Sequence, residues 1–148
     1  MPEQETLERA AEDKAEGKAP STQAGEFVRE EIEHIREGKH GARSTKQAIA
    51  IGLAKARRAG VELSPPAEGK ASKRTRKQAA RDVRAGKSAS KRKKSAKRSR
   101  ATSAALKREG RSAASKTALS RQARSVAAKR SPASRSRAAK KAAATRKK

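Results

Sequence analysis

Two stretches in the first half of the chain carry large apolar residues at helical spacing. In residues 23–37 these residues recur at i, i+4 and i+7, and in residues 44–60 a second apolar stripe follows the same period. One apolar face on an otherwise polar segment is typical of an amphipathic helix that packs on a partner. The pattern therefore predicts two paired helices with a core of Phe27, Val28, Ile32, Ile35, Ile49 and Leu53.

The ends of these two helices carry recognisable signals. Gly38 follows the first helix, where a residue in the left-handed conformation is favoured. Ser44 and Gln47 fit a capping box, in which the two side chains satisfy backbone N–H groups at the start of the second helix. Gly60 marks the end of that helix. Because the loop of residues 39–43 is short, we expect an antiparallel helical hairpin.

Small residues recur along the second helix. Ala48, Gly52 and Ala56 stand at i, i+4 and i+8, and such a stripe lets two helices approach closely. A hairpin of roughly 40 residues is marginal by itself, so we expect this head to form a homodimer or to fold on a partner. The preceding segment, residues 5–16, is rich in helix formers, but Leu7 is its single large apolar residue. It predicts a helix with little to bury.

The second half of the chain has a different composition. Lys, Arg, Ala, Ser and Thr fill 68 of the 79 positions in residues 70–148. Ala, Lys and Arg favour helix, but like charges repel and few apolar residues are available for burial. We therefore predict a mostly α fold with extensive disorder, in which a helical hairpin precedes a low-complexity tail of conditional helices. The expected units are an acidic N-terminal segment (1–20), the hairpin head (21–63), a Pro/Gly linker (64–71) and a basic tail (72–148).

Charge divides the chain at the same place. Residues 1–69 hold 13 acidic and 11 basic side chains, a net charge of −2, whereas residues 70–148 hold 2 acidic and 30 basic ones, a net charge of +28. Cations at this density suit a polyphosphate, because each neutralised phosphate releases condensed counterions. The predicted nucleic-acid-binding residues are Lys55, Arg57, Arg58, Lys73, Arg74, Arg76, Lys77, Arg81, Arg84, Lys91, Arg92, Lys93, Lys94, Lys97, Arg98, Arg100, Arg121, Arg124, Lys129, Arg130, Lys140, Lys141, Arg146, Lys147 and Lys148.

Missing residue types narrow the function further. The chain has no Cys, so disulfides and thiolate metal sites are excluded. Phe27 is the one aromatic residue among Phe, Tyr and Trp, and without stacking platforms duplex DNA is favoured over RNA as a partner. No apolar run approaches the roughly 18 residues of a membrane span. A chain so poor in apolar residues is not expected to be an enzyme, and we predict no cofactor and no small-molecule substrate.

Acidic side chains gather on the first helix of the hairpin, and two histidines lie on either side of its end at Gly38. Two histidines, His34 and His40, are predicted to face solvent, and no metal site is predicted because other ligands are scarce around them. The predicted solvated acidic face consists of Glu26, Glu30, Glu31, Glu33 and Glu37.

One segment resembles a known family. Residues 43–60 read RSTKQAIAIGLAKARRAG, which is similar to the S-x-KQAIAIGL-x-KAR-x-AG box of a family of small bacterial helical domains; the resemblance covers residues 21–63. It implies a short helical domain in a bacterial cytoplasmic protein and carries over no catalytic residue. The tail is similar in composition to the Lys/Ala/Ser-rich tails of bacterial histone-like and linker-histone-like proteins.

Three functions are compatible with these patterns. The first is a nucleoid-associated, cytoplasmic protein that binds DNA without sequence preference and bridges or compacts it. An RNA- or ribosome-associated basic protein is the second, because the charge pattern is nearly the same. The third is an interaction protein whose acidic head helix docks a basic partner or its own tail. The start of the chain, residues 1–5, is acidic and polar, unlike a secretory leader.

Overall fold

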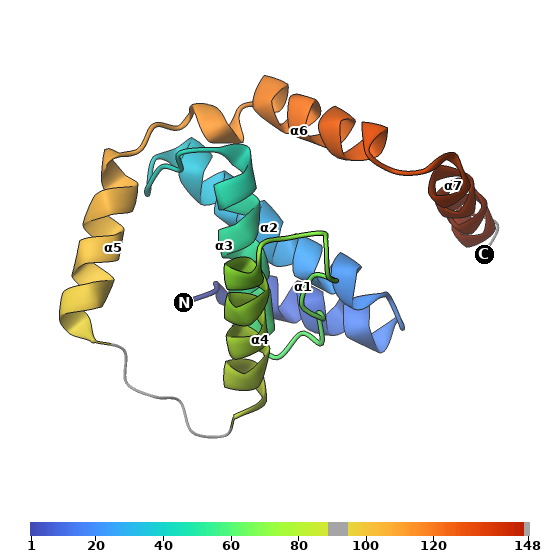
Figure 1. Cartoon of the computed structure of the whole chain (residues 1–148). Coiled ribbons are helices and arrows are strands. Elements are labelled where there is room, and N and C mark those ends of the chain that lie inside the picture. Colours follow the sequence, from blue (N-terminus) through green and yellow to red (C-terminus); the bar gives the residue numbers. More distant parts are fainter. Residues whose placement is uncertain (89–94, 147–148) are drawn as a thin grey trace.

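The computed structural model describes residues 1–88 and 95–146, and within these residues every regular element is a helix (Figure 1). The prediction of a mostly α fold is therefore confirmed. The elements are α1 (Gln4–Ala15), α2 (Pro20–Glu37), α3 (Thr45–Arg58), α4 (Lys73–Lys87), α5 (Ala96–Arg108), the short 3-10 turn η1 (Ser112–Ala114), α6 (Lys116–Ala128) and α7 (Pro132–Arg146).

Helices α2 and α3 form the predicted hairpin, with the expected signals at their ends. Gly38 ends α2 in the left-handed region at φ 80°. The Ser44 hydroxyl accepts the N–H of Gln47 at 3.2 Å, which caps α3. The capping box is not reciprocal, however, because the Gln47 side chain accepts the N–H of Arg43, one residue earlier than the box requires. These contacts fix the loop that turns the chain between the helices.

The two hairpin helices cross at Gly52. A Cβ at this position would lie 2.7 Å from Val28 Cα and 3.0 Å from the Phe27 carbonyl oxygen, so the backbone of α2 occupies the space of a side chain. Ala48 and Ala56, one turn away on either side, are fully buried. The small-residue stripe therefore brings the helices together, as the sequence predicts.

We expect Gly52→Ala to lower the free energy of unfolding by about 1–2 kcal/mol, because the added methyl group meets backbone that cannot turn aside. Gly25→Ala is the matched control, since Gly25 is exposed in α2 with nothing within 4 Å of an added Cβ. There the same change should raise stability by about 0.5–1 kcal/mol through helix propensity. Chemical denaturation of both variants tests the opposite signs. If Gly52→Ala also stabilised the protein, the close crossing would be wrong.

Helix α1 has more to bury than its sequence indicates. Thr6, Ala10 and Asp13 are buried against α2, and Leu7 packs beside a cluster that contains Ala24 and Phe27. Most of this contact is made by small or polar side chains, which a search for large apolar residues does not register. The expectation of an N-terminal helix with little to bury is therefore wrong.

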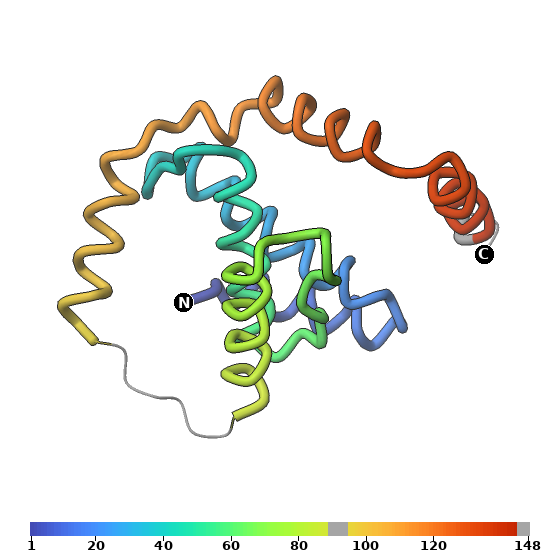
Figure 2. The backbone as a smooth tube through the Cα atoms, viewed as in Figure 1, coloured from blue at the N-terminus to red at the C-terminus, as the bar shows by residue number. Residues whose placement is uncertain are grey.

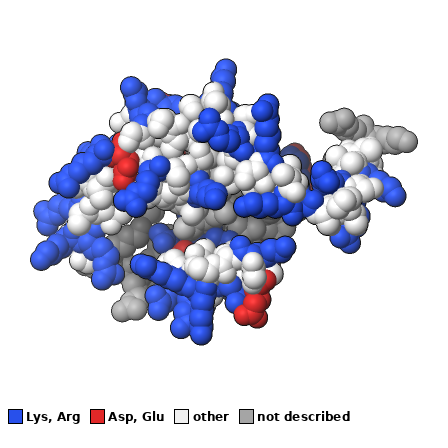
Figure 3. All heavy atoms as spheres, turned by 45° about the horizontal axis from the view of Figure 1, so that its top comes forward, with Lys and Arg blue, Asp and Glu red and all other residues white. Residues whose placement is uncertain are grey.

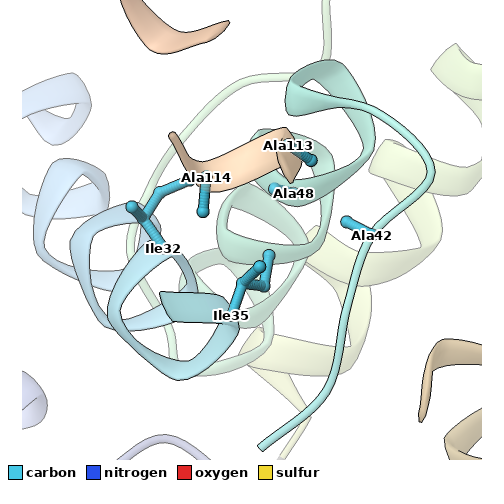
Figure 4. Close-up of a cluster of buried hydrophobic side chains, with 6 residues drawn as sticks. All are labelled: Ile32, Ile35, Ala42, Ala48, Ala113 and Ala114. Carbon is cyan, nitrogen blue, oxygen red and sulfur yellow. The ribbon is translucent and has the colours of Figure 1, made fainter. Parts of the chain in front are cut away.

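A second cluster joins the hairpin to a distant segment (Figure 4). Side chains from α2, α3, the interhelical loop and η1 point toward one another there. The backbone is held as well, because Thr45 Oγ1 donates to the Ala113 carbonyl at 2.7 Å and Arg36 Nε donates to the Ala114 carbonyl at 2.9 Å. The cluster consists of Ile32, Ile35, Ala42, Ala48, Ala113 and Ala114.

Glycine allows this distant segment to dock closely. The N–H of Gly41 donates to the Leu106 carbonyl at 2.9 Å, and the N–H of Ala42 donates to the Gly110 carbonyl at 3.1 Å. A Cβ at Gly41 would lie 1.9 Å from the Glu109 carbonyl oxygen. The chain between α5 and η1 therefore lies directly on the interhelical loop, with no room for a side chain between them.

Helix α4 belongs to the packed part of the molecule, although its sequence lies in the predicted tail. Ala79 and Asp82 are buried, and Arg58 Nε donates to Asp82 Oδ1 at 2.8 Å. A Cβ at Gly86 would lie 2.0 Å from the Arg57 carbonyl oxygen, so α4 is in close contact with the end of α3. We refer to α1–α4 together with η1 as the helical core.

Beyond α4 the chain curves around the helical core (Figures 1 and 2). Helices α5, α6 and α7, which we call the basic arm, follow one another along this curve, and α7 lies farthest from the core. None of the residues of α5 or α6 is buried. The predicted disorder of the tail is not confirmed, because residues 95–146 are described as successive helices. Serine caps help to start them: Ser95 and Ser115 accept the N–H groups of Arg98 and Ala118.

The predicted core residues divide into two groups. Phe27, Ile32 and Ile35 are buried, whereas Val28, Ile49 and Leu53 are half-buried. Most of the buried apolar residues are alanines, which have no pattern that distinguishes them from the alanines of the arm. They are Ala10, Ala24, Ala42, Ala48, Ala56, Ala79, Ala113 and Ala114.

Candidate nucleic-acid interface

Helix α4 carries exposed cationic side chains, and several of them line a groove between α4 and α3. Ala79 and Asp82 are the buried residues of this helix. The groove is lined by Leu53 and Ala54 on one wall and by basic side chains on the other. The predicted residues that are exposed on α4 are Lys73, Arg74, Lys77, Arg81 and Arg84, whereas Arg76 is half-buried beside Glu68 at 3.0 Å.

The basic arm carries further exposed cations. Lys97, Arg98 and Arg100 are exposed on α5, and Arg121 and Arg124 are exposed on α6. In α5 and α6 no Lys or Arg forms an ion pair with a described acid. Figure 3 shows a face on which Lys and Arg side chains predominate and few carboxylates are visible. Further exposed predicted residues are Lys129, Arg130, Lys140 and Lys141.

The two acidic residues after position 70 each lie near an arginine of the helical hairpin. Asp82 is buried beside Arg58, at 2.8 Å, and this pair holds α4 against α3. Glu109 is 33% exposed and lies 3.8 Å from Arg43, which is 84% exposed, so this second pair lies on the surface.

Two head residues predicted to contact nucleic acid are placed elsewhere by the structure. Arg57 is buried, and its guanidinium donates to the carbonyls of Leu63 and Ser64 at 3.1 and 3.4 Å. Burial lowers the pKa of Arg57, and the nearby Asp82 charge opposes that change. Lys55 points inward, with its Nζ atom 2.9 Å from Glu30 and 2.7 Å from Glu31. Arg58 remains half-exposed although it is paired with Asp82.

The predicted solvated acidic face of α2 is wrong for Glu30 and Glu31, whereas the side chains of Glu33 and Glu37 are 45% and 58% exposed. Glu30 and Glu31 are only 2% and 1% exposed. Burial would raise the pKa of Glu30, but hydrogen bonds from Lys55 and the Glu3 N–H oppose it and the pKa is lowered. Burial would lower the pKa of Lys55, but the two carboxylates raise it. The outer acids are paired too: Glu26 with Arg9, Glu33 with Arg29 and Glu37 with Lys39.

Every glutamate of α2 has a cationic neighbour in the head of the molecule. The docking role of this acidic face stays a prediction. Sequence spacing could not reveal the pairing of Glu30 with Lys55, because the two residues are 25 positions apart.

The two histidines are not solvent-facing as predicted. Side-chain exposure is 12% for His34 and 18% for His40, and the rings meet edge to face with centroids 6.2 Å apart. Glu31 joins them, which places two imidazoles and one carboxylate together. The spacing of Glu31 and His34, three residues apart on a helix, is the one sequence signal that could have indicated this cluster.

Some predicted residues lie outside the part of the chain that the structure describes. These are Lys91, Arg92, Lys93, Lys94, Lys147 and Lys148, and the side chain of Arg146 at the end of α7. In residues 1–88 and 95–146 no helix has the length and apolarity needed to cross a membrane. Comparison of the chain with protein-family models, with curated proteins and with solved structures finds no match. The family resemblance of residues 21–63 stays a prediction.

Proposed function

We propose that this protein binds duplex DNA without sequence preference and acts as a histone-like, nucleoid-associated protein. The observation that carries the proposal is the set of exposed cations on α4 and the basic arm. The two acids of this half of the chain, Asp82 and Glu109, lie near Arg58 and Arg43. When lysine and arginine neutralise DNA phosphates, condensed counterions leave the DNA, and this release favours binding. Phosphate contacts carry no sequence information, so the binding has no sequence preference.

The way the arm is attached supports this function. The chain after α5 is held on the interhelical loop and at η1, so α5 is fixed at its C-terminal end, whereas α7 extends beyond this attachment. Cations on successive helices can then contact phosphates along one duplex. A second copy joined through the core, or a second duplex on α7, would bridge DNA segments and compact them.

Duplex DNA is favoured over single-stranded nucleic acid for a structural reason. Phe27 is 1% exposed inside the core, so it provides no surface on which a base can stack. Duplex DNA, which presents a regular array of phosphates, therefore fits the described surface better than single-stranded nucleic acid, which presents unstacked bases.

The test is a salt-dependent binding titration on random-sequence duplex DNA, with structured RNA as competitor. If about 10 phosphates are neutralised, the log–log slope of affinity against salt should be near −9. We expect the slope to be steep, equal for unrelated duplex sequences, and little affected by RNA at equal phosphate concentration. A slope close to zero would exclude the proposal. Displacement of the DNA by RNA would assign the surface to an RNA- or ribosome-associated role instead.

A further inference from the structure

Three donor side chains converge where α2 ends. Glu31 and His34 stand one turn apart on α2, and His40 follows in the loop after Gly38. One donor atom from each of the three lies within 4.8 Å of the others. Two imidazoles and one carboxylate form a donor set that suits divalent transition metals, zinc above all.

The contacts of the His40 ring bring two hydrogen-bond acceptors face to face. His40 Nδ1 lies 3.1 Å from the Gly41 carbonyl oxygen, which can only accept, so Nδ1 carries the hydrogen. In the neutral ring Nε2 then has a lone pair, and this atom faces Glu31 Oε1 at 3.1 Å. Two acceptors at this distance repel unless a positive charge lies between them. A metal ion bound to both removes the conflict, and a second proton on His40 is the competing explanation.

His34 is oriented in the manner of a metal ligand. Its Nε2 lies 2.8 Å from Glu3 Oε1, and a carboxylate acceptor assigns the hydrogen to that nitrogen. Nδ1 is therefore the nitrogen with a lone pair. Glu3 is itself fixed by Lys39, whose Nζ atom lies 3.1 Å away. A carboxylate behind the imidazole is the usual outer shell of a histidine that binds zinc, because it fixes the tautomer and increases the basicity of the ligand.

The buried carboxylate adds an independent observation. Glu31 is 1% exposed, and its Oε1 atom accepts no hydrogen bond from a described residue. Its Oε2 atom lies 2.7 Å from Lys55 Nζ, which it shares with Glu30.

We propose that Glu31, His34 and His40 bind a zinc ion, with the remaining coordination position open to water. Binding would fasten the loop to α2, and the same loop carries Gly41 and Ala42, whose N–H groups hold the chain between α5 and η1. The ion would therefore strengthen the attachment of the arm. The site does not depend on the proposed DNA binding, because its ligands lie on the core.

The experiment is a titration of the full, metal-stripped chain with zinc by calorimetry, and with cobalt by absorption spectroscopy. We expect one saturable site per chain and the visible band of low-coordinate cobalt. His40→Gln and His34→Gln should abolish both, and Glu3→Gln should weaken zinc binding by about tenfold, as outer-shell changes do. Glu33→Gln is the matched control, since Glu33 lies on α2 but pairs with Arg29, and it should bind as the unaltered chain does.

Circular dichroism confirms that each variant is folded before its affinity is interpreted. Absence of saturable binding would overturn the proposal, as would binding that survives in both histidine variants. NMR of the unaltered chain provides the remaining distinction. A doubly protonated His40 at neutral pH that is unchanged by zinc would show that a proton, and not a metal ion, separates it from Glu31.

Discussion

Replacing Lys55 with Met is expected to lower the free energy of unfolding by about 3 kcal/mol. The Lys55 ammonium group is the shared cation of Glu30 and Glu31, at 2.9 and 2.7 Å, and both carboxylates are almost completely buried. Methionine keeps the volume of the side chain but removes the charge, which leaves two carboxylates in a poorly solvated site. We expect the lower end of the usual range for a broken buried pair because the Lys55 side chain is still 21% exposed.

Lys46→Met is the control for this change. Lys46 lies on the same helix and is exposed, so its loss should alter stability by no more than about 0.5 kcal/mol. A second comparison separates charge from packing: Lys55→Met combined with Glu30→Gln and Glu31→Gln should be more stable than Lys55→Met alone, since no unpaired charge remains. Chemical denaturation in metal-free buffer measures all three. Equal stabilities of the Lys46 and Lys55 variants would contradict the buried pairing.

The parts of the fold that sequence predicts are those governed by neighbours along the chain. Apolar spacing locates α2 and α3, the Ser44 cap starts α3, and the small-residue stripe through Gly52 brings the helices together. Each of these signals acts within one or two helical turns, where the chemistry of the residue decides the local structure. The same local physics predicts helices in the second half of the chain, because alanine and long cationic side chains favour them there.

The parts that sequence does not predict depend on partners far along the chain. Glu30 and Glu31 look like a solvated acidic face until Lys55 is placed against them. Ala113 and Ala114 resemble every other alanine of the basic half, yet they are buried because Thr45 and Arg36 bind their carbonyls from 68 and 78 residues away. Alanine gives no periodic signal that separates a core position from a solvated one.

The candidate interface shows the same division. The exposure of Lys97, Arg98 and Arg100 follows from their helix having no apolar face to bury, which composition predicts. Lys55 turns inward toward the buried acids Glu30 and Glu31, and Arg57 turns inward toward the carbonyls of residues 63 and 64. Composition does not contain the positions of these partners. Charge counting therefore describes the arm well and describes the core poorly.

Neutralising the arm at α5 is expected to weaken DNA binding strongly while leaving the fold intact. Changing Lys97, Arg98 and Arg100 to Gln removes three exposed cations from a helix with no buried residue, and Gln matches Lys and Arg closely in helix propensity. If all three contact phosphates, the log–log salt slope becomes shallower by about 2.7, and affinity at 0.15 M salt falls by roughly a hundredfold.

The matched control distinguishes the surface of the arm from the charge of the whole chain. Changing Lys14, Lys18 and Arg29 to Gln removes three exposed cations from the core, so both variants fall from +26 to +23. Two of the control residues already pair with acids, Lys18 with Asp13 and Arg29 with Glu33, so their loss should change the slope by less than one. A localised interface requires that the arm variant lose far more affinity than the control variant. An equal loss of affinity in the two variants would mean that net charge alone governs binding.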